Sequence, residues 1–164
     1  MAKVALNIAV RTATEADAAD IVPLWRELME LHAEVDPRFD LTERAEDRFL
    51  NYLELARNRD DHRVRVAVEG GCIVGFTVAC VLPNSPIYAR RWVGYINDLA
   101  VHHRCRGRGV GRRLVSDAVV WLRTAGAESI EVYVAMANDD ARRFWRKMGA
   151  EDYLERVSLK PGVV

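Results

Sequence analysis

The feature that most constrains this sequence is a basic, glycine-rich turn between an apolar strand, predicted over 92–101, and an amphipathic helix. Glycines at alternate positions (Gly107, Gly109 and Gly111) remove Cβ atoms that would keep a ligand away from the main chain. The first N–H groups of the helix have no partner within it, and the helix dipole adds partial positive charge there. The pattern therefore predicts a phosphate-binding site. The helix is indicated by apolar residues at helical spacing, namely Leu114, Val115, Ala118, Val119 and Leu122.

The spacing of the glycines separates three kinds of phosphate-binding loop. A Walker A loop needs Lys-Ser or Lys-Thr after its glycines, and neither pair follows here. A dinucleotide-binding loop needs a third glycine where this chain has Arg112. The sequence instead fits Arg-x-x-Gly-x-Gly, with Arg106, Gly109 and Gly111. The alternative is a strand–helix turn whose glycines only allow tight packing and whose arginines are solvated.

Length and composition predict one domain over residues 1–164, which the order of elements given below makes α/β, and composition excludes several function classes. Half of the residues are hydrophobic, which is enough for a substantial core. The 24 basic and 24 acidic residues balance, so no overall field favours nucleic acid or an anionic membrane. No apolar run has membrane length, and the three cysteines suit a reducing, cytoplasmic location. His102 and His103 lack a second ligand pair at metal spacing, so no metal is expected.

The hydrophobic pattern alternates between strand and helix periods along the chain. Thr14 and Asp17 resemble a capping box before the first helix, and Gly70-Gly71 is typical of a hairpin turn. The order predicts a mixed β-sheet flanked by helices. Strands are expected over 4–10, 64–69, 72–82, 92–101, 130–135 and 151–160, and helices over about 20–35, 42–57 and 139–148, besides the one after the glycine turn.

The Arg-x-x-Gly-x-Gly turn resembles the acyl-CoA pyrophosphate loop of the Gcn5-related N-acetyltransferase (GNAT) superfamily. The resemblance extends from Val10 to Ala150 and includes Asn-Asp-Leu-Ala-Val before the turn. It also includes Asn138-x-x-Ala141-x-x-Phe144-Trp145 and the Gly149 stop. The resemblance implies the GNAT acyl-CoA N-acyltransferase fold, whose mixed sheet has two parallel central strands that splay apart.

The resemblance also implies acetyl-CoA as co-substrate and assigns residues to it. The pantetheine arm would bond to the main chain of Leu99, Ala100 and Val101. Asn138 would lie beside this arm, although Asn is equally suited to cap the following helix. Trp145 would either form a wall beside the thioester or simply pack its helix. The pyrophosphate would be held at the turn by Arg106, Gly107, Arg108, Gly109, Val110, Gly111 and Arg112.

Acetyl transfer to an amine requires that the amine lose its proton, which costs roughly 4–5 kcal/mol at neutral pH. Family members often carry a carboxylate on the strand before the turn, and the candidates here are Asn97 and Asp98. Neighbours on a strand face opposite ways, so only one is expected on the active-site face. If that residue is Asn97, water or an acid such as Glu34 must serve as base. The alternative for Asp98 is a buried polar tie to nearby backbone.

A proton donor for the leaving thiolate is less evident. Many relatives have Tyr where this chain has Trp145, and an indole N–H cannot usefully deliver a proton. Either the thiolate leaves unaided, or Tyr133 or Tyr153 assists it.

These observations predict an enzyme that moves an acetyl group from acetyl-CoA to a primary amine by direct attack within a ternary complex. The amine could belong to a small molecule, a peptide or a protein. The alternative is a non-catalytic acetyl-CoA-binding sensor or scaffold. No nucleic acid or membrane partner is expected, and exposed sheet edges would allow a homodimer.

Overall fold

The computed structural model describes residues 7–162 and contains one mixed sheet, as predicted, with five strands rather than the six expected. The strands lie side by side in chain order, and each of the first four is antiparallel to its neighbour. The last strand runs parallel to the fourth, which makes the sheet mixed. The strands are β1 (Ile8–Thr12), β2 (His62–Glu69), β3 (Cys72–Pro83), β4 (Trp92–Val101) and β5 (Ser129–Glu131).

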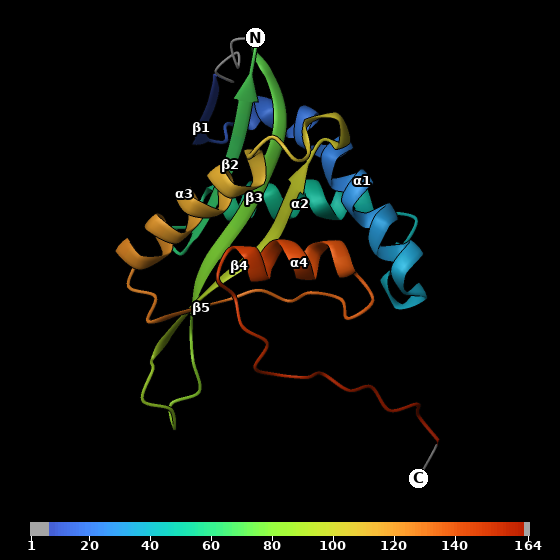
Figure 1. Cartoon of the computed structure of the whole chain (residues 1–164), viewed down its shortest axis with the longest axis vertical. Coiled ribbons are helices and arrows are strands. Elements are labelled where there is room, and N and C mark those ends of the chain that lie inside the picture. Colours follow the sequence, from blue (N-terminus) through green and yellow to red (C-terminus); the bar gives the residue numbers. More distant parts are fainter. Residues whose placement is uncertain (1–6, 163–164) are drawn as a thin grey trace.

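Helices cover both faces of the sheet (Figure 1). One face packs against α1 (Ala18–Val35) and α2 (Ala45–Arg57), the other against α3 (Val110–Thr124). Strand alternation divides the core accordingly, because successive side chains point to opposite faces. Toward α1 and α2 lie Val64, Val66, Phe76, Val78 and Ala100. Toward α3 lie Ala79, Val81 and Ile96, and α4 (Asp139–Lys147) adds Phe144 and Trp145 to this cluster.

The predicted capping box is present before α1. The Thr14 N–H donates to Asp17 Oδ2 at 2.6 Å, and Arg11 donates to both oxygens of the same carboxylate. These bonds, chiefly those from Arg11, hold the pKa of Asp17 well below its usual range. The helix begins at Ala18, and Pro23 lies inside it.

Two strand predictions fail near the C-terminus. The strand expected over 130–135 is reduced to Ser129–Glu131, and the expected last strand over 151–160 does not form. Residues 151–160 alternate apolar and polar, but alternation alone supplies no pairing partner, and β5 offers only a short edge. The expected start of the first strand, Val4 and Leu6, lies outside the described residues.

Candidate active site

β4 is paired with β5 over only the first part of its length. They pair only where Val93, Gly94 and Tyr95 meet Ser129, Ile130 and Glu131. β4 continues to Val101, so the stretch 96–101 has no described strand on this side. Alternate main-chain N–H and C=O groups along this open edge are left without a ladder partner. The open edge includes the segment 99–101 predicted for the pantetheine arm.

The open edge leads directly into the glycine turn. Gly107 and Gly109 have φ values of +71° and +86°, a region that residues with a Cβ rarely adopt. A Cβ built on either glycine meets nothing within 4 Å. Glycine is therefore favoured at these two positions by the positive φ angle and not by a lack of space for a side chain. Gly111 differs, because its Cβ would lie 3.4 Å from the Phe144 ring. Among the three glycines, only Gly111 has neighbours that an added Cβ would touch.

The five arginines around the turn divide into two groups. Three are bonded to the protein: Arg106 to Val101 O and Glu27, Arg108 to Glu69, and Arg113 to Ile8 O. The side chains of Arg104 and Arg112 make no hydrogen bond or ion pair with residues 7–162, and both residues are exposed. The first group holds the turn against neighbouring elements, and the second leaves two guanidinium groups available to an anion.

On α4, the predicted structural roles are confirmed: Asn138 caps the helix, and Trp145 packs it against its neighbours. Asn138 is buried and caps the helix, because its Oδ1 accepts from Ala141 N–H at 3.0 Å. Trp145 is partly buried on the α3 side of the sheet and meets Phe144 edge-on at 5.2 Å. Their contacts with a coenzyme stay predictions.

A β-bulge places Asn97 and Asp98 on the same face of the sheet. Pairing with β3 moves from Val78 opposite Asp98 to Ala79 opposite Ile96, so Asn97 is the extra residue. Ile96 points toward α3, whereas Asp98 is paired with Val78, which faces α1 and α2, and Asn97 donates to Tyr52 of α2. The prediction that these neighbours face opposite ways is therefore wrong, because strand alternation is interrupted at the bulge.

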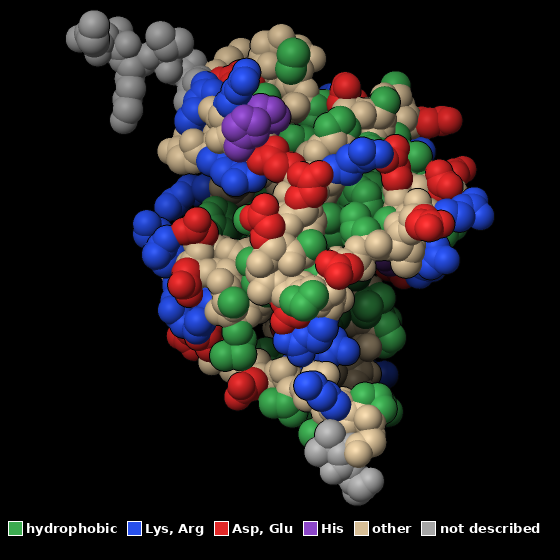
Figure 2. Space-filling view, turned by 90° about the vertical axis from the view of Figure 1, so that its right-hand side faces the viewer, with side chains coloured by type: hydrophobic (Ala, Val, Ile, Leu, Met, Phe, Trp, Pro, Cys, Tyr) green, Lys and Arg blue, Asp and Glu red, His purple; other side chains and the backbone are tan. Residues whose placement is uncertain are grey.

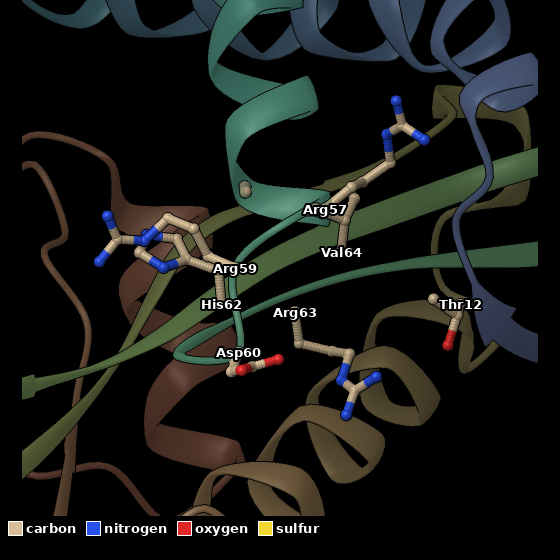
Figure 3. A pocket seen from close by; sticks show the side chains of 8 residues that line it. Thr12, Arg57, Arg59, Asp60, His62, Arg63 and Val64 are labelled. Atoms are coloured by element: carbon tan, nitrogen blue, oxygen red, sulfur yellow. The ribbon is translucent and has the colours of Figure 1, made fainter.

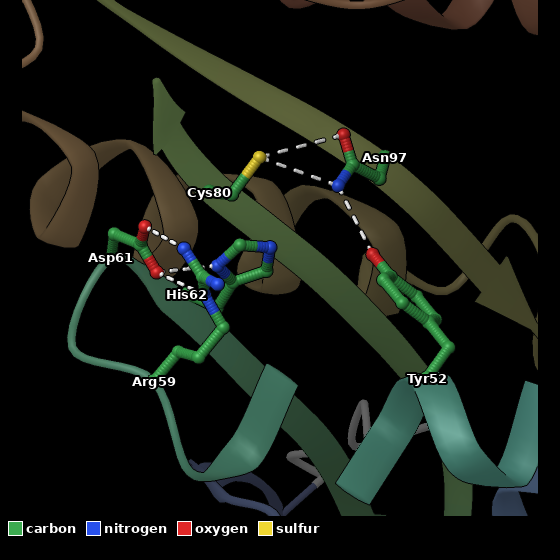
Figure 4. Close-up of polar contacts among 6 residues, drawn as sticks. All are labelled: Tyr52, Arg59, Asp61, His62, Cys80 and Asn97. Atoms are coloured by element: carbon green, nitrogen blue, oxygen red, sulfur yellow. Dashed lines mark hydrogen bonds and ion pairs between the residues drawn. The ribbon is translucent and has the colours of Figure 1, made fainter. Parts of the chain in front are cut away.

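Asn97 links two elements through its amide (Figure 4). Its Nδ2 donates to the Tyr52 hydroxyl at 3.1 Å and lies 3.4 Å from Cys80 Sγ on β3. Burial raises the pKa of Tyr52 to about 12, so the phenol stays protonated. The sequence pattern does not single out Tyr52, because its position beside Phe49 and Leu53 in α2 is typical of the apolar helix face.

Asp98 is partly buried, and its carboxyl loses its proton at higher pH than an ordinary aspartate. Burial raises the pKa of its carboxyl to about 6. The side chain makes no hydrogen bond with residues 7–162, although its main-chain oxygen accepts from Thr77 Oγ1 at 2.7 Å. The predicted alternative, a tie between the carboxylate and nearby backbone, thus has no partner among the described residues.

The two tyrosines considered as proton donors lie near β5. Tyr133 is exposed and stacks on Tyr95, with ring centroids 6.1 Å apart. Tyr153 donates its hydroxyl proton to Glu131 Oε1 at 2.8 Å, a contact that raises its pKa to about 12. A phenol held in this way is a poor proton donor to a thiolate.

A small pocket of about 140 Å³ lies apart from β4, at the start of β2 (Figure 3). Four of its lining residues are basic: Arg57, Arg59, His62 and Arg63. Figure 3 shows the three guanidinium groups pointing in different directions rather than toward one point. We therefore place the candidate active site along β4 and its turn.

Residues 25–150 match the model of the acetyltransferase (GNAT) family. The chain belongs to this family. An uncharacterized N-acetyltransferase of Archaeoglobus fulgidus is 36% identical over 95 residues, 58% of this chain and 64% of the relative. The uncharacterized N-acetyltransferase YhfO of Bacillus subtilis is 27% identical over 87% of this chain and 89% of its own. The chain thus spans slightly less than two thirds of the archaeal relative.

Solved structures of other proteins share the fold. The BH1408 protein of Bacillus halodurans, as a mutant, superposes with a TM-score of 0.81 at 23% identity, covering 93% of this chain and 99% of its own. Aminoglycoside N-acetyltransferase AAC(6')-Iy in complex with CoA gives 0.77 at 15% identity, with 99% of each chain covered. Glucosamine-6-phosphate N-acetyltransferase of Arabidopsis thaliana gives 0.71 at 18% identity, covering 94% and 99%. Within residues 7–162, no helix has the length and apolarity needed to cross a membrane.

Proposed function

We propose that this GNAT-family protein transfers the acetyl group of acetyl-CoA to a primary amine by direct attack within a ternary complex. The observation that carries the proposal is the continuity of β4. Its unpaired edge leads into the cationic glycine turn, and the same strand presents Asp98 one residue before the segment 99–101.

The coenzyme would lie along the open edge of β4. The main-chain groups of Leu99, Ala100 and Val101 would bond to the pantetheine arm, and the free N–H groups at the start of α3 would hold the pyrophosphate. Arg112 is best placed among the turn arginines to add charge, since it stands in the first turn of α3 and has no described partner. The Asn138 amide, whose oxygen is used in capping, would offer its N–H₂ group to the arm.

Asp98 would act as the general base. An amine bound on the α1–α2 face arrives protonated, and a carboxylate with a pKa of about 6 can take that proton directly or through one water. Asn97 and Tyr52 would orient the acceptor from the same face, because the bulge turns Asn97 toward α2. The neutral amine then attacks the thioester carbonyl, and holding the two reactants together supplies much of the rate.

The thiolate would leave without a dedicated acid. Trp145 has only an indole N–H, and the Tyr153 hydroxyl is held by Glu131. A thiol has a pKa near 8.5, so the thiolate is a tolerable leaving group at neutral pH.

The structural neighbours support an amine as acceptor, since two of them are named for the acetylation of aminoglycosides and of glucosamine 6-phosphate. The test is an assay of free CoA release over a panel of amino sugars, polyamines, amino acids and peptides. Turnover with at least one amine supports the proposal. Saturable binding of acetyl-CoA without turnover over the whole panel would instead identify a non-catalytic acetyl-CoA-binding module.

A further inference from the structure

Glu27, His102 and His103 form a group of metal-ligating side chains beside the glycine turn. Each offers one ligand atom, and the three atoms lie within 4.8 Å of one another. No second group of this kind occurs among residues 7–162. Figure 2 shows a histidine patch on the surface of the molecule, with acidic and basic side chains at its edge. We propose that these three residues bind one divalent transition-metal ion of the Zn²⁺ type.

The two imidazoles are already arranged side by side. Their rings stack with centroids 4.4 Å apart, and His103 Nδ1 lies 3.4 Å from Glu27 Oε2. His102 Nδ1 accepts a long hydrogen bond of 3.3 Å from the Arg104 N–H. An ion bound at His102 Nδ1 would replace this long hydrogen bond, because an imidazole nitrogen ligates a metal through the same lone pair that accepts a hydrogen bond. Coordination of one ion would require the three ligand atoms, which lie within 4.8 Å of one another, to move closer together.

The two carboxylate oxygens of Glu27 have different neighbours, so one can pair with Arg106 while the other binds an ion. Its Oε1 accepts from Arg106 Nη2 at 2.5 Å, whereas Oε2 faces His103. An ion bound at Oε2 leaves the pair with Arg106 intact. Hydrogen bonds to the second oxygen of a ligating carboxylate are typical of metal sites, because they fix its orientation.

The chemical nature of the three ligand atoms indicates which kind of metal ion would bind. Two imidazole nitrogens and one carboxylate oxygen suit Zn²⁺ and similar ions, whereas Ca²⁺ and Mg²⁺ prefer oxygen ligands alone. Three protein ligands leave a fourth position for water. The neighbouring Arg106 guanidinium repels a cation, so affinity should be lower than at a four-ligand structural zinc site. The ion would join α1 to the turn after β4.

Metal binding can be measured without any acetylation assay. The full chain is freed of metal by dialysis against a chelator and titrated with Zn²⁺ in a calorimeter at neutral pH. Co²⁺ provides a visible spectrum that reports nitrogen and oxygen ligands. We expect one ion per chain, with affinity reduced about tenfold or more in His103→Ala, in His102→Ala and in Glu27→Gln.

Matched controls use ligand-type residues outside the group. The His32→Ala and His62→Ala variants should bind Zn²⁺ as the parent does, and so should Cys72→Ser, which removes an exposed thiol. Circular dichroism confirms that each variant is folded. Absence of binding in the parent would overturn the proposal, as would unchanged binding in His103→Ala or loss of binding in Cys72→Ser. Failure of acetyl transfer would leave this result unaffected.

Discussion

The glycine turn and the Asn97–Asp98 bulge belong to one continuous stretch of chain, yet they differ in almost every physical respect. The turn is exposed, strongly cationic and built from main-chain groups that two positive-φ glycines uncover. The bulge is partly buried, carries no cation, and presents side chains toward α2. The exposed, cationic turn is suited to binding a diphosphate, and the partly buried bulge is suited to removing a proton from an amine.

The difference follows from the two ligands. A diphosphate keeps part of its charge in water, so N–H groups and guanidinium groups can hold it at an open surface. A carboxylate becomes a useful base near neutral pH only when burial raises its pKa. The sequence must therefore provide an open turn and a partly dry pocket side by side.

The largest expected effect comes from Asp98→Asn. The rate of acetyl transfer should fall by about 10²- to 10⁴-fold, because the general base is lost. The free energy of unfolding at neutral pH should rise by about 1–3 kcal/mol, because the variant no longer buries an ionised carboxyl. Steady-state kinetics and urea unfolding measure the two quantities.

Asp117→Asn is the matched control for this prediction. Its carboxylate pairs with Arg65 on the opposite face of the sheet, at 2.6 Å. This variant should lose stability while keeping its activity. If Asp98→Asn also lost stability and kept its rate, Asp98 would be a structural residue.

The pH dependence of stability and of activity also distinguishes a catalytic role of Asp98 from a structural one. The folded-state pKa of Asp98, about 6, lies above its ordinary value of 3.8, so the folded protein binds this proton more tightly than the unfolded chain does. The contribution of Asp98 to stability should therefore decline as pH rises from about 4 to about 6, and activity should rise through about pH 6. Asp98→Asn should abolish both changes. A parent pH–rate profile that is flat between pH 5 and roughly 7 would contradict the assignment.

A smaller effect is expected from Gly109→Ala, which tests the turn. Holding alanine at a φ of +86° costs about 1–2 kcal/mol, and relaxation of the turn should weaken acetyl-CoA binding by about tenfold. Gly71→Ala in the β2–β3 hairpin is a close control, with a φ of +84° and equally open surroundings. It should lose similar stability and retain coenzyme affinity, as measured by calorimetry. Equal affinity in both variants would remove the turn from the binding site.

The smallest effect is expected from Arg112→Gln. An exposed guanidinium contributes about 1 kcal/mol to holding a phosphate, so affinity for acetyl-CoA should fall roughly fivefold, and less at high salt. Arg113→Gln should instead reduce stability, because Arg113 is bonded to Ile8 O. Affinity measured at two salt concentrations distinguishes the two arginines. The reverse pattern would show that the pairing of the turn arginines changes when the coenzyme binds.

The turn could be predicted from sequence because its determinants are local: the glycine spacing, the arginines and the apolar period of α3. The bulge could not, because the register of β3 against β4 decides whether Asn97 is the extra residue. Tyr52 could not be singled out, because it falls within the apolar helical pattern of α2. The group of Glu27, His102 and His103 could not be predicted either, because Glu27 lies far from the two histidines in sequence. The expected last strand failed because an alternating pattern does not specify a pairing partner.

The central claim is that the main-chain N–H groups of residues 107–112 hold the pyrophosphate of acetyl-CoA. Amide NMR shifts of the isotope-labelled chain, recorded while CoA is added, test it directly. We predict the largest shift changes at Gly107, Gly109 and Gly111, with little change at Gly70 and Gly71. Saturable CoA binding that leaves the amides of 107–112 unshifted would contradict the account.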